Sequence, residues 1–306
     1  MQRFSSAVLE FMKAHVPQED ILFGEQMKDH TTFRIGGEAA CFVRISSTEQ
    51  LIKIIPYLKE VDLPYFILGN GSNLLVSDKG YNGVILQVAD KFAQIEAQGP
   101  VLKIQAGAML SQVSRYAMEH SLSGLEFASG IPGTIGGGVV MNAGAYEGEM
   151  RQIVESVTVL NDEGEILELD NTTMEFGYRT SIIKNRHFIV LEVMLRLKEG
   201  IREEILAKME ELSEKRREKQ PLAFPSAGST FKRPDGYYAG KLIMDAGLRG
   251  YSIGGARVSE KHCGFVINTG KATAEDVAEV IKEVQDRVKD RFGVLLEREV
   301  IYLGEI

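Results

Sequence analysis

The sequence predicts a mixed protein of short strands and helices, divided into two or three domains. Its 306 residues exceed the usual size of a single domain, about 100–200 residues. From Phe42 onward, short apolar runs alternate with segments whose apolar residues recur at helical spacing. Near Gly200 the composition changes, because a strand rich in branched residues gives way to a highly charged helix. We therefore predict a larger part over residues 1–200, with lobes of about 1–80 and 81–200, and a smaller part over 201–306.

In the larger part, short runs of branched and aromatic residues predict most of the strands. These are expected at 42–45, 64–68, 83–88, 101–104 and 187–197, with a hairpin formed by 155–160 and 164–169 around the turn Asn161-Asp-Glu-Gly. Helices are expected around Val8–Met12, over 47–60 and around 111–119. The helix over 47–60 begins with a Ser47…Gln50 capping box, and Pro56 inside it is expected to kink or shorten it.

In the smaller part, the sequence predicts two helices and a terminal strand. The first helix covers 201–219 and ends before Pro221. The second covers 273–291, is capped by Thr273 and stops at Gly293. A strand over 294–303 is expected to follow it.

Composition excludes several classes of function. A net charge of −8 argues against general binding to nucleic acid, which needs a basic face. Cys41 and Cys263 give neither a disulfide framework nor metal-ligand spacing, and we expect both to be buried. The five histidines are widely spread, so no metal site is expected. The start of the chain, 1–6, does not resemble a secretory leader, and no apolar run reaches the roughly 18 residues that a membrane span needs. We expect a soluble, cytoplasmic protein.

Two glycine loops carry the strongest functional signal. Gly69-Asn-Gly-Ser-Asn73 follows a predicted strand, and Ser129-Gly-Ile-Pro-Gly-Thr-Ile-Gly-Gly-Gly138 continues to Asn142-Ala-Gly144. Glycine permits positive φ and close approach of the backbone, so successive N–H groups can converge on an anion. Neither loop has the spacing of the dinucleotide-binding or P-loop motifs. The loops predict a phosphate-bearing ligand held in another way; the alternative is a pair of tight turns in a β-rich domain.

These loops resemble the two diphosphate-binding loops of the vanillyl-alcohol-oxidase type of FAD domain. Their residues are most similar to those of the UDP-N-acetylenolpyruvoylglucosamine reductase family. The segment Thr31-Thr-Phe-Arg-Ile-Gly-Gly37 also matches the opening motif of that family. The resemblance runs from about Thr31 to the C-terminus. It implies an α+β fold, with a two-lobed FAD-binding domain followed by a smaller α/β substrate-binding domain. The FAD-binding residues it implies are Arg34, Gly69, Asn70, Gly71, Ser72, Asn73, Ser129, Gly130, Ile131, Pro132, Gly133, Thr134, Gly136, Gly137, Asn142 and Gly144.

Three polar segments resemble the family's active-site motifs and supply Arg179, Ser229 and Glu299. In the family's reaction, hydride from NADPH passes by way of FAD to the CH2 end of an enolpyruvyl ether on UDP-N-acetylglucosamine. The substrate carboxylate then becomes an enediolate-like dianion. Arg179 is expected to hold it by paired hydrogen bonds, Glu299 to assist in its protonated form, and Ser229 to deliver the last proton to carbon. A protonated Glu299 requires its pKa to be raised above the usual value of ~4.3.

Each of these residues also has an ordinary structural reading. Arg179 alone could be a surface cation and Ser229 a turn residue, and the choice of Glu299 over Glu297 rests on the resemblance. The resemblance also implies substrate contacts by Tyr178, Lys232, Arg233 and Lys241. Arg233 stands where the family more often has Asn, so solvated charge is the alternative for it. The short connection between Tyr178 and Lys219 matches the shorter, type II form of the family.

Two other functions compete with this reading. One is a different FAD oxidoreductase of the same superfamily, whose members often tether FAD through His, Cys or Tyr. Neither glycine loop contains His or Cys, so non-covalent FAD is expected. The other is a non-catalytic module that binds a nucleotide sugar or FAD, which would leave Arg179, Ser229 and Glu299 without a role. We expect a monomeric enzyme whose partners are NADPH and the enolpyruvyl nucleotide sugar.

Overall fold

The computed structural model describes residues 6–306, which form two compact units. The first unit comprises the chain up to Phe23, residues 41–70 and residues 83–215. The second comprises residues 24–40, 71–82 and 216–306. Residues 1–5, on which the expectation about a leader depends, lie outside the described part. The boundary near Gly200 stays a prediction about functional domains, while the compact units divide the chain at other positions.

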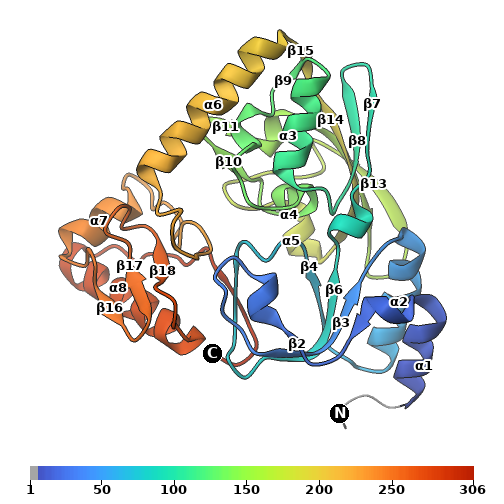
Figure 1. Ribbon diagram of the computed structural model, residues 1–306, viewed down its shortest axis with the longest axis horizontal. Helices are drawn as coiled ribbons and strands as arrows, with labels where there is room; N and C mark the ends of the chain where they lie inside the picture. The colour runs from blue at the N-terminus through green and yellow to red at the C-terminus, as the bar shows by residue number, and fades with distance from the viewer. Residues whose placement is uncertain (1–5) are drawn as a thin grey trace. The chain divides into compact units, whose positions relative to one another are not determined.

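The first unit contains strands of two five-stranded sheets, one of which has the order β1-β3-β6-β4, with β2 (Glu25–Gln26) also paired to β3 (Figure 1). Its strands are β1 (Ile21–Leu22), β3 (Glu38–Arg44), β6 (Tyr81–Gln87) and β4 (Tyr65–Leu68). β4 and β6 are parallel, with Tyr65 opposite Val84, and β1 is antiparallel to β3. Because β6 belongs to this sheet, the sheet extends past residue 80, where we predicted the lobe boundary.

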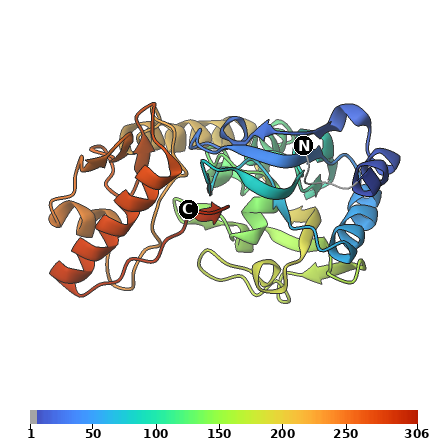
Figure 2. The same ribbon diagram turned by 90° about the horizontal axis from the view of Figure 1, so that it is seen from below.

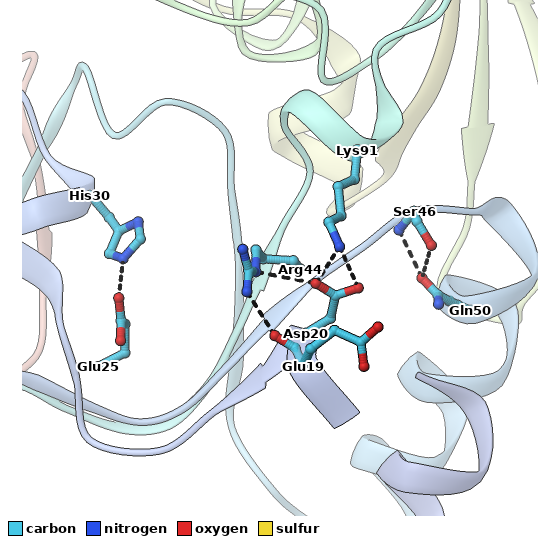
Figure 3. Close-up of polar contacts among 8 residues, drawn as sticks. All are labelled: Glu19, Asp20, Glu25, His30, Arg44, Ser46, Gln50 and Lys91. Atoms are coloured by element: carbon cyan, nitrogen blue, oxygen red, sulfur yellow. Dashed lines mark hydrogen bonds and ion pairs between the residues drawn. The ribbon is translucent and has the colours of Figure 1, made fainter. Parts of the chain in front are cut away.

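Helices α1 (Ser6–His15) and α2 (Thr48–Glu60) contact each other beside this sheet. Ser47 caps α2 by accepting a hydrogen bond from the Gln50 N–H, but the Gln50 side chain accepts from Ser46 and not from Ser47 (Figure 3). The predicted shortening of this helix at Pro56 is wrong, since α2 continues to Glu60. Leu51, Ile54, Ile55 and Leu58 are buried on one side of α2, and this packing outweighs the lost backbone hydrogen bond.

The second sheet of this unit is antiparallel, with the order β13-β12-β14-β8-β7. Its strands are β7 (Ile95–Gln98), β8 (Val101–Gln105), β12 (Val154–Leu160), β13 (Ile166–Asp170) and β14 (Ile189–Arg196). The predicted hairpin is confirmed, with Leu160 opposite Ile166. Helix α4 (Ile135–Val140) lies against β14 and β8, and it contacts α3 (Leu110–Glu119) (Figure 1). The sheet thereby supports the segment that begins directly after the second glycine loop.

Shorter elements complete the unit, and one apolar core fills it. These elements are η1 (Gln18–Asp20), η3 (Asp90–Phe92), β9 (Leu122–Ser123), η4 (Glu126–Ala128), β10 (Gly144–Ala145), β11 (Gly148–Glu149), η5 (Met150–Gln152), α5 (Ile182–Arg186) and β15 (Lys198–Glu199). Helix α6 (Arg202–Lys219) leads the chain out of this unit.

The second unit has a three-stranded antiparallel sheet covered by a long helix. The sheet is formed by β16 (Ser252–Ile253), β17 (Ala256–Val258) and β18 (Val266–Asn268), and α8 (Ala274–Phe292) packs on it (Figure 2). The remaining elements are β2 (Glu25–Gln26), η2 (Met27–His30), β5 (Leu74–Val76), α7 (Ala239–Asp245) and β19 (Ile301–Leu303). Phe33, Ile35 and Leu75 belong to the same apolar core as the C-terminal residues. Burial of these three side chains explains why two early segments belong to the second unit.

The ends of α8 follow the predicted signals, but the terminal strand does not. Thr273 and Asp276 form a capping box at the start of α8, and Gly293 ends it with φ of 70°. The strand predicted over 294–303 is too long: β19 covers Ile301–Leu303, which pair in parallel with β5. Before it, the Leu296 carbonyl accepts from the side chain of Gln285, and a single bridge joins Arg298 to Phe231. Among residues 6–306, no helix is both long and apolar enough to cross a membrane.

Candidate functional site

The first glycine loop is packed against the turn that precedes the Thr31–Gly37 motif. Gly71 has φ of +60°, and a Cβ at this position would lie 2.0 Å from the carbonyl oxygen of His30. Only glycine fits such a position. The Thr32 N–H donates to the Gly71 carbonyl at 3.3 Å. Asn73, which ends the loop, donates from Nδ2 to the Glu299 carbonyl at 3.2 Å. The end of the loop therefore lies next to a predicted catalytic residue of the same unit.

In the first unit, the start of this loop contacts the second glycine loop. Asn70 Nδ2 donates to the Pro132 carbonyl at 2.7 Å. A Cβ at Gly69 would lie 2.6 Å from Oγ1 of Thr134, so the two loops approach more closely than any side chain would allow. Thr134 also caps α4, since its Oγ1 accepts from the Gly137 N–H. The structure thus brings together two segments that the sequence identified separately.

The second loop is fixed from behind by backbone hydrogen bonds. Gly133 accepts from the Leu110 N–H at 2.9 Å, and the Ile135 and Gly136 N–H groups donate to Ala108 and Ala106. Gly130, Pro132 and Gly137 remain exposed at the front of the loop. A ligand can therefore reach the loop's backbone while its opposite side is held by the protein.

A partly buried ion cluster lies behind this arrangement, and no pattern in the sequence predicts it. The Asp20 side chain is buried; Lys91 Nζ lies 2.5 Å from its Oδ1, and Arg44 Nε lies 3.3 Å from the same oxygen (Figure 3). Lys91 belongs to η3, whose Phe92 carbonyl accepts from the Gly107 N–H at 2.8 Å. Gly107 lies between the two alanines that hold the second loop.

A separate polar contact lies in the second unit, where Nε2 of His30 forms a hydrogen bond with Oε1 of Glu25 at 2.8 Å (Figure 3).

Arg179 lies in the first unit on a turn next to Gly144. Its guanidinium donates to the Gly144 carbonyl at 3.3 Å. Its φ of 56° is unusual for a residue other than glycine, and such strain is found more often at functional sites. Asn142 holds this turn, because its Nδ2 donates to the Gly177 carbonyl and to Glu149, both at 3.0 Å. Three predicted residues, Asn142, Gly144 and Arg179, are thereby brought together.

Ser229 and Glu299 lie on neighbouring segments of the second unit. The Glu299 N–H donates to the Thr230 carbonyl at 2.9 Å, and the Lys232 N–H donates to the Glu297 carbonyl at 2.8 Å. Thr230 is completely buried, whereas Ser229 beside it is exposed. The exposed hydroxyl and the carboxyl residue are therefore held by one short stretch of paired backbone.

Comparison with known proteins gives matches along nearly the whole chain. Residues 39–170 match a family model described as an FAD binding domain, and residues 220–303 match the C-terminal domain of UDP-N-acetylenolpyruvoylglucosamine reductase. A protein of that name from Caldanaerobacter subterraneus is 51% identical over 97% of this chain and 98% of its own length. Another, from Clostridioides difficile, is 51% identical over 94% of this chain and 95% of its own. The chain belongs to the UDP-N-acetylenolpyruvoylglucosamine reductase family.

A solved structure extends this assignment to the fold. The UDP-N-acetylenolpyruvylglucosamine reductase from Thermus caldophilus is 36% identical, with a TM-score of 0.79 over 92% of this chain and 98% of that protein. The resemblance stated from the motifs is confirmed, and so is the α+β fold class of an FAD-binding domain followed by a smaller C-terminal domain. As a member of this family, the chain is an FAD oxidoreductase.

The predicted FAD-binding loops expose backbone at two glycines of the second loop, Gly130 and Gly137. At Gly69, Gly71 and Gly136 a Cβ would lie 2.9 Å or less from neighbouring protein atoms, so glycine at these positions allows the loops to pack closely. Backbone N–H groups are the donors that a diphosphate needs. Several of the predicted contacts already have protein partners; among them, Ser129 Oγ donates to the Glu126 carbonyl at 2.8 Å, and Asn142 braces the Arg179 turn. Arg34, with φ of 55°, lies on the turn that follows Thr31.

The predicted substrate residues occupy different environments. Lys232 forms an ion pair with Glu297, and Lys241 pairs with Asp245 on α7 at 2.8 Å. The guanidinium of Arg233 lies 4.0 Å from the centre of the Tyr238 ring, and its Nε donates to the Tyr237 carbonyl. Tyr178 is exposed beside Arg179. Arg233 is therefore an exposed cation that also contacts its own loop.

Two buried polar residues of the second unit were not predicted from the sequence. Thr230 accepts from the Val266 N–H through Oγ1 at 2.9 Å, and Asn268 Nδ2 donates to the Phe33 carbonyl at 3.0 Å. Thr230 lies in the same polar segment as Ser229, and Asn268 follows the apolar run 265–267, so neither position by itself predicts a buried polar side chain. In the part of the chain that the structure describes, three or more possible metal ligands do not gather at any point.

Proposed function

We propose that this chain reduces UDP-N-acetylglucosamine enolpyruvate to UDP-N-acetylmuramate, using NADPH, for peptidoglycan precursor synthesis in the cytoplasm. The observation that carries the proposal is the near-complete alignment, at 51% identity, with a relative that bears the reductase name. The neighbouring placement of Ser229 and Glu299 supports it, because a binding module would need neither residue in this arrangement. We further propose that the enzyme acts as a monomer.

The two glycine loops would hold the diphosphate of FAD, and Arg34 and Gly144 would contact the same cofactor. When bound, FAD supplies a hydride acceptor for NADPH and a hydride donor for the enolpyruvyl group. The backbone N–H groups of the loops would hold FAD in place. They would add no acid or base that could compete with the proposed catalytic groups. Asn142 would act through the Arg179 turn that it braces.

Arg179 would bind the substrate carboxylate. Addition of hydride to the CH2 end leaves charge on the adjacent carbon, and this charge spreads into the carboxylate. A guanidinium offers two parallel N–H donors to the two oxygens, and the interaction strengthens as the charge grows. The Gly144 carbonyl and the bracing of the turn by Asn142 limit the motion of the Arg179 side chain before substrate binds.

Ser229 and Glu299 would complete the reaction. Protonated Glu299 would donate a hydrogen bond to the dianion, and the Ser229 hydroxyl would deliver a proton to carbon. Lys232, Arg233 and Lys241 would meet the diphosphate of the nucleotide sugar. Lys232 would then exchange its exposed partner Glu297 for a phosphate, an exchange of one charge-assisted contact for another.

Flavin colour tests the proposed activity directly. We expect purified protein to be yellow, to bleach when NADPH is added without oxygen, and to regain its colour when UDP-N-acetylglucosamine enolpyruvate follows. UDP-N-acetylglucosamine, which lacks the enolpyruvyl group, is the matched control and should leave the flavin bleached. Recovery of colour with both nucleotide sugars, or with neither, would contradict the proposal.

FAD is expected to be bound without a covalent link. Burial raises the pKa of the Cys41 thiol to about 12 and also raises the pKa of Cys263, so both thiols stay protonated and are poor nucleophiles. Precipitation with acid should therefore release all the yellow flavin into the supernatant. Flavin that stays with the protein pellet would favour the superfamily oxidases that tether their cofactor.

A further inference from the structure

Thr230 connects the proposed proton donor to three parts of the second unit. Its N–H donates to the Gly264 carbonyl at 2.8 Å, and its carbonyl accepts from the Glu299 N–H at 2.9 Å. Its side-chain oxygen accepts from the Val266 N–H. Ser229 directly precedes this buried residue, so the position of its exposed hydroxyl depends on where the Gly264 turn holds Thr230.

The Gly264 turn is closed by the imidazole of His262. The Gly264 N–H donates to Nδ1 of His262 at 3.2 Å, and the Phe265 N–H donates to the His262 carbonyl at 3.0 Å. The ring is packed closely against the turn, because a Cβ at Gly264 would lie 2.9 Å from its Cε1. On its other side, a Cβ at Gly240 would lie 3.5 Å from the same atom. The imidazole thus fills the space between two glycines.

The hydrogen bond fixes the chemical state of the ring. Nδ1 can accept from an N–H only when it carries no proton, so the imidazole is neutral with its proton on Nε2. Burial lowers the pKa of His262, which favours the same neutral form. Gly264 is itself buried, so its N–H depends on this acceptor.

We propose that His262 is a positioning residue for Ser229: its Nδ1 holds the Gly264 turn, whose carbonyl holds Thr230 and with it the serine hydroxyl. The proposal rests on the proposed function, in which Ser229 gives a proton to the substrate. It predicts that His262 affects the step in which substrate reoxidises the flavin, and not the step in which NADPH reduces it. The alternative is that His262 only packs against Phe265, whose ring centre lies 5.0 Å away.

The variants His262→Asn and His262→Leu separate these roles. Both side chains branch at Cγ and have similar size, but only asparagine places an acceptor where Nδ1 stands. With leucine, the buried Gly264 N–H loses its partner, and we expect flavin reoxidation by the enolpyruvyl substrate to slow by about 10- to 100-fold. Asparagine should restore most of that rate. Reduction of FAD by NADPH should stay within about twofold of the unmodified protein in both variants.

A double variant keeps the test decisive if His262→Leu also lowers stability. If His262 acts through Ser229, adding His262→Leu to Ser229→Ala should slow reoxidation by less than about twofold further. FAD content and thermal unfolding are measured for every variant, so that loss of fold is not taken for loss of positioning.

The outcomes also distinguish failure of this inference from failure of the proposed function. Equal rates for His262→Asn and His262→Leu, or equal loss in both half-reactions, would overturn the positioning role. So would a full additional loss in the double variant. If Ser229→Ala slows reoxidation selectively while His262→Leu does not, the proposed function stands and only the inference fails. If Ser229→Ala has no selective effect, the proton-donor role itself is wrong.

Discussion

Replacing Ser229 with alanine is expected to slow reoxidation of the flavin by the enolpyruvyl substrate by at least ~10²–10³-fold, the usual cost of removing one stabilising or proton-donating group. Reduction of FAD by NADPH should be nearly unchanged, because that half-reaction needs no proton on carbon. Stopped-flow absorbance of the flavin measures the two half-reactions separately. The selective loss follows from the exposed position of Ser229 beside the buried Thr230 and the Glu299 backbone.

Ser252→Ala is the matched control for this experiment. Ser252 is an exposed serine on β16 of the same unit, so its replacement removes the same hydroxyl group from a surface position. Both half-reactions of this variant should match those of the unmodified protein. If Ser229→Ala slowed the two half-reactions equally, the residue would be acting on the flavin site as a whole and not as the proton donor.

Much of the fold was predictable because its signals are local. The cap at Thr273, the stop at Gly293 and the hairpin around Asn161 each depend on a few adjacent residues, and the structure confirms them. The two glycine loops were predictable for the same reason. Their packing together was not, since the hydrogen bond from Asn70 to Pro132 joins positions 62 residues apart.

What the sequence could not predict depends on partners far along the chain. The terminal strand is shorter than its branched residues suggest, because only Ile301–Leu303 find a neighbouring strand, β5. Pro56 does not end its helix, because buried neighbours hold both sides of it. Asp20 lies 71 residues from Lys91 and is an ordinary acidic residue in the sequence. Its burial between two cations exists only in the folded chain.

The proposed catalytic residues show the same limit more clearly. Resemblance to the family's motifs pointed to Arg179, Ser229 and Glu299. The alternation of side chains along a strand did not by itself distinguish Glu299 from Glu297, because both would face the same side. The structure gives the two residues different surroundings. The Glu297 carboxylate forms an ion pair with Lys232, whereas Glu299 lies next to the first glycine loop, because Asn73 donates to its carbonyl. In the sequence, His262 is one of several cations beside a glycine or turn, and the positioning role proposed for it depends on its contact with Gly264.

Replacing Arg179 with lysine is expected to produce the second large effect, a loss of at least ~10²-fold in flavin reoxidation by the enolpyruvyl substrate. Lysine keeps the positive charge, but an ammonium cannot offer two parallel donors to the two oxygens of a carboxylate. The backbone at this position should be unaffected, since both residues have the same difficulty in adopting φ of 56°.

Arg186→Lys is the matched control. Arg186 is an exposed arginine on α5 a few residues later, so this variant makes the same exchange away from the turn and should leave the rate unchanged. Measurement of both half-reactions and of bound FAD distinguishes loss of carboxylate binding from loss of cofactor. A lysine variant that kept the rate within about fivefold would show that a point charge is sufficient, and the paired-donor role of Arg179 would have to be abandoned.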